Sequence, residues 1–130
     1  MNIPIKTLKS GFSLPVYGLG TWEMGGRWEA DHSKDDAEVS AIKAAIEHGI
    51  THIDTAESYG AGHAEELVAE AVKKQDRSRL IIATKVSGDH QGYDGVMKAF
   101  EASLKRLDMS YVDLYLLHRY PEPGISTADT

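Results

Sequence analysis

The sequence predicts an α/β fold with parallel strands, and three observations lead to this fold class. Apolar runs without alternation recur along the chain, as expected for strands that are buried on both faces of a parallel sheet. Segments with a helical spacing of apolar residues separate these runs. A polar residue follows each run at nearly constant intervals of about 30 residues, the length of one strand-plus-helix unit. Repeated units of this kind indicate an α/β domain.

The first elements are a hairpin and a strand. Residues 5–17 contain two short apolar segments around Lys9-Ser10-Gly11, and this pattern predicts a β-hairpin ahead of the repeating units. The first strand of the repeat is predicted at residues 16–19. It leads into a loop at residues 22–32 that is rich in glycine and acidic side chains.

Three helices are predicted between the later strands. Ser33 and Asp36 resemble a capping pair, so the first helix should begin there and stop at Gly49. The second helix has the most regular apolar stripe, made by Ala64, Leu67, Val68, Ala71 and Val72. The third carries a similar stripe that Ser103 interrupts: Val96, Phe100, Ser103, Leu104 and Leu107. The tail at 120–130 ends in Ser-Thr-Ala-Asp-Thr, which resembles the start of a further helix, so we expect the chain to stop within a fold.

Composition restricts the class of protein. The 130 residues fit a single domain with a real hydrophobic core, because 42% of them are hydrophobic. A net charge of −6 argues against binding to nucleic acid, which needs a positive surface. The sequence has no cysteine, so thiolate chemistry is excluded. No apolar stretch has the length of a membrane span and the N-terminus does not resemble a signal peptide, so we expect a cytoplasmic protein with no membrane partner.

Four polar side chains form the candidate site. Asp54, Lys85 and His118 each close an apolar run, and Tyr59 follows Asp54 across a short loop. The carboxyl ends of parallel strands lie at one edge of a sheet, so these residues should converge. A lysine beside a phenol favours the phenolate and lowers the tyrosine pKa, which would make Tyr59 a proton donor. Asp54 would orient Lys85, and His118 would orient a carbonyl oxygen or relay a proton.

Taken singly, each of these residues has a structural interpretation as a turn former, an exposed strand-end lysine or a backbone-bonded histidine. Their joint occurrence at matching positions favours chemistry. A metal site is the competing use, with His52, His63, His90 and His118 beside Asp54 or Glu57 as ligands. No HxH or HExxH spacing occurs, and we predict no metal. Gly18-Leu19-Gly20 lacks the third glycine of a nucleotide-binding loop.

The chain resembles the aldo-keto reductases in four segments. They are Gly18-Leu19-Gly20-Thr21-Trp22, the segment Gly49-Ile50-Thr51-His52-Ile53-Asp54-Thr55-Ala56-Glu57-Ser58-Tyr59-Gly60, then Ile81-Ile82-Ala83-Thr84-Lys85, and Tyr111-Val112-Asp113-Leu114-Tyr115-Leu116-Leu117-His118. The resemblance implies a (β/α)8 TIM-type barrel preceded by a hairpin. It also implies hydride transfer from NADPH to an aldehyde or ketone.

The same resemblance implies roles for individual residues. Tyr59 is similar to the general acid of the family, Asp54 and Lys85 to the pair that tunes it, and His118 to the residue that orients the carbonyl. Gly20, Thr21 and Trp22, with Asp54, correspond to contacts with the nicotinamide end of the cofactor. Trp22, Trp28 and His118 would border the small carbonyl substrate.

A complete barrel takes about 250 residues, so this chain would supply about the first half. The residues that grip the adenosine and its phosphate in the family belong to the other half, so the isolated chain is expected to be incomplete for cofactor binding. Two alternatives to a reductase stay open. One is a non-catalytic half-barrel that self-associates, or docks on a complementary half, through exposed sheet edges. The other is a cofactor-sensing regulatory member of the family.

Overall fold

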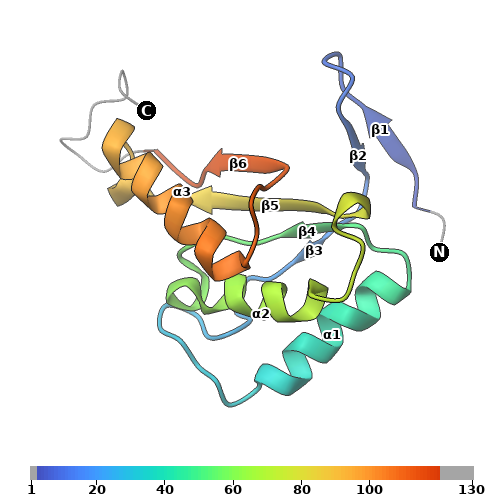
Figure 1. Ribbon diagram of the computed structural model, residues 1–130, viewed down its shortest axis with the longest axis horizontal. Coiled ribbons are helices and arrows are strands. Elements are labelled where there is room, and N and C mark those ends of the chain that lie inside the picture. The colour runs from blue at the N-terminus through green and yellow to red at the C-terminus, as the bar shows by residue number, and fades with distance from the viewer. Residues whose placement is uncertain (1–2, 121–130) are drawn as a thin grey trace.

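A two-stranded hairpin precedes a four-stranded parallel sheet with three helices on one face (Figure 1). The computed structural model describes residues 3–120. The strands are β1 (Ile5–Thr7), β2 (Ser13–Pro15), β3 (Leu19–Gly20), β4 (His52–Asp54), β5 (Ile81–Val86) and β6 (Leu114–Leu117). The helices are α1 (Asp35–Glu47), α2 (His63–Val72) and α3 (Tyr93–Leu107), with short 3-10 turns at Tyr59–Gly62, Arg77–Arg79 and Gly88–His90.

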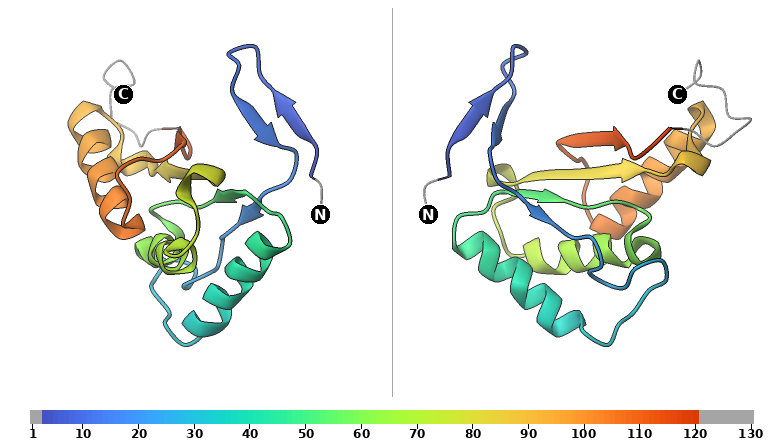
Figure 2. Two further views of the ribbon diagram at one scale, coloured as in Figure 1. Left: turned by 45° about the vertical axis from the view of Figure 1, so that its right-hand side comes forward. Right: turned by 180° about the vertical axis from the view of Figure 1, so that it is seen from behind.

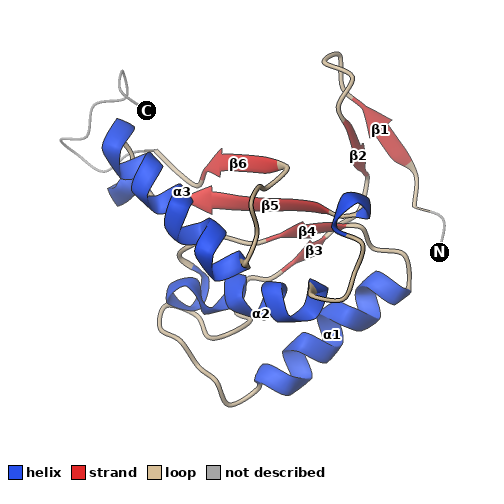
Figure 3. Cartoon of the chain, viewed as in Figure 1, coloured by secondary structure: helices blue, strands red, loops and turns tan. Residues whose placement is uncertain are grey.

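The sheet has the order β3-β4-β5-β6, and every neighbouring pair is parallel. One α-helix lies in each connection between consecutive strands, and a long loop joins β3 to α1 (Figure 3). The strands therefore have the same order in the sheet as in the sequence, and each new strand is added on the same side of the previous one. This confirms the predicted α/β class with parallel strands, and the arrangement is part of a TIM-type barrel.

The hydrophobic core lies between the sheet and the helices. α2 packs against both α1 and α3, and the three helices cover the same face of the sheet (Figures 1 and 2). The core consists of Ile42, Ile53, Leu67, Val68, Ala71, Val72, Leu80, Ile82 and Leu107. Because side chains alternate along a strand, Ile53 and Ile82 face the helices while Asp54 and Lys85 face the opposite, open side.

The hairpin forms where it was predicted. Its turn is closed by a bond from the Leu8 amide to the Phe12 carbonyl at 2.8 Å, and Gly11 takes the positive φ of +89° that favours glycine. Figure 2 shows the hairpin standing away from the sheet. The predicted strand at 16–19 is wrong in its start, because the Val16 amide bonds to Pro4 and extends the hairpin.

The first helix begins later than predicted and without the predicted cap. α1 starts at Asp35, and no side chain caps its first turn. The Ser33 amide instead donates to Asp31 Oδ1 at 2.9 Å, so Ser33 belongs to a turn before the helix. The predicted stop is confirmed, because Gly49 has φ of +99° and its amide bonds to Ile46 at 2.9 Å.

The stripe of α2 is confirmed, since all five apolar residues predicted for it are buried. Of the stripe predicted for α3, Ser103 and Leu107 are buried, while Val96, Phe100 and Leu104 are half-buried. The serine that interrupts the α3 stripe is also fully buried, and Ser103 Oγ accepts a bond from Arg106 Nη2 at 3.2 Å. The helix start predicted in the tail lies outside the described residues. Within the part of the chain that the structure describes, no helix has the length and apolar character that a membrane crossing requires.

Candidate active site

The ends of three neighbouring strands bring the predicted residues together. Asp54 is the last residue of β4, and His118 directly follows β6. Lys85 lies inside β5 rather than past its end, because the strand continues to Val86. Tyr59 opens the 3-10 turn between β4 and α2. Adjacent parallel strands end at one edge of the sheet, so all four side chains reach the same region on its open side.

The ammonium group of Lys85 is the centre of the site. Its Nζ donates to Asp54 Oδ2 at 2.7 Å, to the Thr55 carbonyl at 2.8 Å and to Tyr59 Oη at 3.3 Å. The lysine side chain is only 13% exposed. Two short bonds thus fix the ammonium while the third reaches the phenol oxygen. Because Tyr59 Oη accepts this bond, its own proton is directed to another acceptor.

His118 completes the site from the far strand. Its Nδ1 lies 3.3 Å from Ser58 Oγ, and its ring meets the ring of Tyr59 edge-on at a centroid distance of 5.4 Å. Burial lowers the pKa of His118 below its usual 6.5, and the positive charge of Lys85 lowers it further. The imidazole is therefore neutral at physiological pH. A neutral ring suits hydrogen bonding to an uncharged carbonyl oxygen.

The loop that carries Tyr59 is held by an unusual backbone. Gly60 and Ala61 both have positive φ, at +55° and +54°. A Cβ at Gly60 would lie 2.3 Å from the Gly25 carbonyl oxygen, so only glycine fits there. The Gly60 amide also donates to the Arg27 carbonyl at 3.2 Å. The loop after β3 thus packs directly on the turn that positions the phenol.

Two tryptophans from the loop after β3 extend the site. The Trp22 ring meets the Tyr59 ring edge-on at a centroid distance of 4.9 Å, and it meets the Trp28 ring edge-on at 5.1 Å. Both indoles are exposed, at 40% and 60%. The two rings lie together on one side of the phenol, where they could contact a bound molecule.

Gly20 and Thr21, the other residues predicted to contact the cofactor at the end of β3, differ in their exposure. Gly20 is exposed, and an added Cβ would meet nothing within 4 Å, so its backbone is open to a ligand. Thr21 is fully buried, and both its amide and its hydroxyl donate to the Asp54 carbonyl, at 3.0 and 3.2 Å. Thr21 therefore holds the end of β4, next to the carboxylate that orients Lys85.

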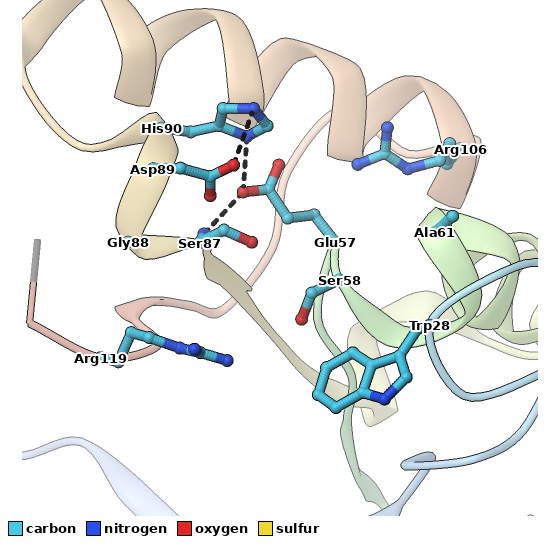
Figure 4. Close-up of a pocket in the computed structure, with 10 residues that line it drawn as sticks. All are labelled: Trp28, Glu57, Ser58, Ala61, Ser87, Gly88, Asp89, His90, Arg106 and Arg119. Atoms are coloured by element: carbon cyan, nitrogen blue, oxygen red, sulfur yellow. Dashed lines mark hydrogen bonds and ion pairs between the residues drawn. The ribbon is translucent and has the colours of Figure 1, made fainter. Parts of the chain in front are cut away.

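A cleft of about 680 Å³ lies beside Trp28 and Ser58 and is shown in Figure 4. Its lining consists of Trp28, Glu57, Ser58, Ala61, Ser87, Gly88, Asp89, His90, Arg106 and Arg119. Glu57 Oε1 accepts bonds from the Ser87 amide at 2.6 Å and from His90 Nδ1 at 3.0 Å. This carboxylate joins the loop after β4 to the loop after β5. From the sequence, Glu57 was considered only as a metal ligand, and Ser58 was assigned no role.

The histidines that were considered as metal ligands make separate contacts in different parts of the molecule. His90 pairs with Glu57, and His118 contacts Ser58. His63 lies between Asp35 and Glu66 at the start of α2. Among residues 3–120, the grouping of three or more metal-type side chains is His32, Asp35 and His63. It is distinct from the site around Lys85.

Known proteins resemble this chain in sequence and in fold. The sequence profile of the aldo/keto reductase family matches residues 17–124, and this chain belongs to that family. The chain is 46% identical over 106 residues to methylglyoxal reductase YeaE of Escherichia coli, which covers 82% of the chain and 36% of that protein. It is 39% identical over 125 residues to an aldo-keto reductase of a Mycobacterium species, covering 95% of the chain and 41% of the relative.

Solved structures give the same result. The thermostable aldo-keto reductase Tm1743, in complex with the inhibitor epalrestat, superposes with a TM-score of 0.93 at 45% identity, over 98% of this chain and 46% of that one. An aldo-keto reductase of Klebsiella pneumoniae in complex with NADPH gives a TM-score of 0.81 at 38% identity, over 94% of this chain and 41% of that one. The chain thus spans less than half the length of the relatives it matches.

Proposed function

We propose that this chain carries the proton-transfer site of an NADPH-dependent reductase of aldehydes or ketones. The observation that carries the proposal is the position of Lys85 Nζ, 2.7 Å from Asp54 Oδ2 and 3.3 Å from Tyr59 Oη. Reduction of a carbonyl leaves negative charge on its oxygen, and a positioned acid must neutralise that charge. A phenol beside a fixed ammonium has both features. Membership in the aldo/keto reductase family supports this assignment.

The proton moves from Tyr59 Oη to the substrate oxygen. As the phenolate forms, the Lys85 ammonium stabilises it, and Asp54 keeps the ammonium in place. His118, neutral through its lowered pKa, donates a second hydrogen bond to the same oxygen and fixes the carbonyl in line with the phenol. Trp22 and Trp28 exclude water from one side of the reacting group.

The end of β3 fits the nicotinamide part of the cofactor. Gly20 presents open backbone beside Asp54, its partner in the ladder. Trp22 offers an exposed indole next to it. When bound, NADPH supplies the hydride. Gly20, Thr21, Trp22 and Asp54 are the residues that we assign to this end. Relatives solved with NADPH or NADP support this choice of cofactor.

Titration of the purified chain with NADPH and NADH, followed through the fluorescence of Trp22 and Trp28, tests the cofactor assignment. Size-exclusion chromatography of the same sample reports its association state. Saturable quenching by NADPH would support the cofactor assignment. In a complete barrel, made by joining this chain to the remainder of the Tm1743 relative, His118→Ala should lower carbonyl turnover more than NADPH affinity. The reverse pattern would place His118 at the nucleotide.

A second candidate function is assembly through the open sheet. Within the described residues, β6 has β5 as its single neighbour, and Leu116 and Leu117 on this strand are 41% and 58% exposed. An exposed apolar edge strand is a site for pairing with a further strand. If assembly is the function, Leu117→Lys should shift an associated species to monomer in chromatography. A monomeric parent chain would remove this candidate.

A further inference from the structure

A second group of titratable side chains lies on the helix layer, away from Lys85. His32 belongs to the loop after β3, Asp35 is the first residue of α1, and His63 is the first residue of α2. One ligand-type atom from each lies within 4.8 Å of the other two. Figure 1 shows this loop passing the start of α2 on its way to α1. Two segments that are distant in sequence, the stretch from His32 to Asp35 and the start of α2, therefore meet at one point.

The atoms of the group lie at hydrogen-bonding distance, slightly closer together than the ligands of a metal ion. His63 Nε2 lies 2.8 Å from Asp35 Oδ1, and His32 Nδ1 lies 3.1 Å from Asp35 Oδ2. The two imidazole rings are 3.9 Å apart between centroids. Bond lengths of about 2.0–2.2 Å place neighbouring ligands of a tetrahedral zinc ion about 3.3 Å apart. Small side-chain adjustments would open the group enough to admit the ion.

A fourth residue orients the buried imidazole. Glu66 Oε2 lies 2.7 Å from His63 Nδ1. Histidine ligands commonly donate their other ring nitrogen to a carboxylate, which fixes the ring and leaves the remaining nitrogen for the metal. The His63 side chain is only 7% exposed, whereas that of His32 is 67% exposed. The buried His63 is thus held in place, whereas the exposed His32 leaves room for a water ligand.

The surrounding charges attract a cation. A hollow of about 520 Å³ beside the group is lined by the carboxylates of Asp35, Asp36, Glu66 and Glu70 and by a single ammonium, that of Lys43. The excess of negative charge raises the local concentration of divalent ions.

We propose that His32, Asp35 and His63 bind a zinc ion, with water as the fourth ligand and Glu66 holding His63. Two imidazoles with one carboxylate suit Zn²⁺, whereas Mg²⁺ and Ca²⁺ require mostly oxygen ligands. The ion would tie the loop that carries Trp22 and Trp28 to the start of α2, directly after the turn of Tyr59. This departs from the sequence-based expectation of no metal.

Titration of the metal-free chain with Zn²⁺ alone, in competition with a chromophoric chelator, tests the site. We expect one ion per chain and a rise in the thermal unfolding midpoint, because the ion binds the folded state. Co²⁺ should give the intense visible absorption of a tetrahedral complex. Absence of saturable one-to-one binding would overturn the proposal. Displacement by equal concentrations of Mg²⁺ would also overturn it, because it would indicate a general acidic patch.

Matched variants locate the ion. His32→Ala should abolish one-to-one binding, whereas His48→Ala, at an exposed histidine beyond the end of α1, should leave it intact. Asp35→Asn should weaken binding far more than the neighbouring Asp36→Asn, which removes one charge of the hollow but no ligand. Glu66→Gln should weaken it by about 10- to 100-fold. Equal binding by His32→Ala and His48→Ala would overturn the assignment. Circular dichroism checks that each variant is folded. If Asp35→Asn unfolds, the His32→Ala variant still tests the site, because His32 is exposed. None of these measurements uses NADPH or a carbonyl, so they are independent of the proposed reductase activity.

Discussion

Neighbouring residues of β5 carry polar networks on opposite faces of the sheet, and the two networks differ in character. Thr84 faces the helices, where its hydroxyl donates to Glu65 Oε1 at 2.5 Å and Arg106 Nε donates to Glu65 Oε2 at 2.6 Å. Lys85 faces the open side and bonds to Asp54 and Tyr59. Glu65 is completely buried, whereas the Asp54 side chain is 34% exposed.

The difference shows what distinguishes a structural network from a chemical one. Both carboxylate oxygens of Glu65 are satisfied within the protein, so that network joins α2, α3 and β5 and leaves no free carboxylate oxygen for a ligand. The network around Lys85 ends at the phenol of Tyr59, which lies beside exposed tryptophans. Changes to the two networks should therefore separate, with activity lost on one face of β5 and stability lost on the other.

Tyr59→Phe should have the largest effect. Removing a positioned general acid should lower kcat by roughly 10²–10⁴-fold, because the group that gives its proton to the developing oxyanion is then missing. We expect the NADPH affinity and the thermal midpoint to change little. Turnover of an aldehyde by the chimera with the Tm1743 remainder measures the loss. Tyr93→Phe, at a residue 69% exposed on α3, is the matched control. Equal turnover by the two variants would remove Tyr59 from its assigned role.

The active-site face was predictable because its residues lie at repeated positions. Asp54, Lys85 and His118 lie at or next to the carboxyl ends of successive strands, so the period of the chain places them together. Glu65 gave no such signal, since a glutamate near a helix start is usually solvated. Its burial depends on the approach of Arg106 from α3. Likewise, nothing in the spacing of His32 and His63 shows that two helix starts meet, because tertiary packing brings them together.

The element boundaries were less predictable because of competing hydrogen bonds. Val16 continues an apolar pattern, but its amide pairs with Pro4 in the hairpin rather than with the sheet. Ser33 is a residue type that commonly caps a helix, but its amide donates to Asp31 Oδ1 in a turn before the helix. In both cases a local hydrogen bond that competes with the expected one determined where the element begins.

Glu65→Ala should give the largest loss of stability. It leaves the Thr84 hydroxyl buried without its partner and Arg106 without its counter-charge, and breaking such a buried pair costs about 3 kcal/mol. Urea denaturation followed by circular dichroism measures the free energy of unfolding. Glu70→Ala is the control on the same helix, because Glu70 and Lys73 are both more than half exposed and their pair contributes less than about 1 kcal/mol. Equal losses in the two variants would show that the Glu65 network is not structural.

Gly60→Ala should affect both faces by a smaller amount. A Cβ in this backbone, with φ of +55°, would collide with the Gly25 carbonyl oxygen and cost about 1–3 kcal/mol. The loop after β3 would move away from the turn that holds Tyr59. We expect a lower urea midpoint together with a change in the fluorescence of Trp22. Gly20→Ala, where the added Cβ meets nothing within 4 Å, should leave the midpoint unchanged. If Gly60→Ala behaved like Gly20→Ala, the contact between the two loops would not restrain the site.

The smallest expected effect is a pH dependence of stability from His118. Burial and the charges of Lys85 and Arg119 lower its folded pKa, although Asp54 and Glu57 oppose the shift. The unfolded chain then binds a proton near pH 6.5 before the folded one does, so the free energy of unfolding should fall as the pH drops below about 6.5. Urea midpoints from about pH 7.5 to about 5.5, for the parent and for His118→Gln, measure this contribution as a difference. A parent curve parallel to that of His118→Gln would mean that the histidine accepts its proton as readily as in water. The neutral imidazole on which carbonyl orientation depends would then exist only at higher pH.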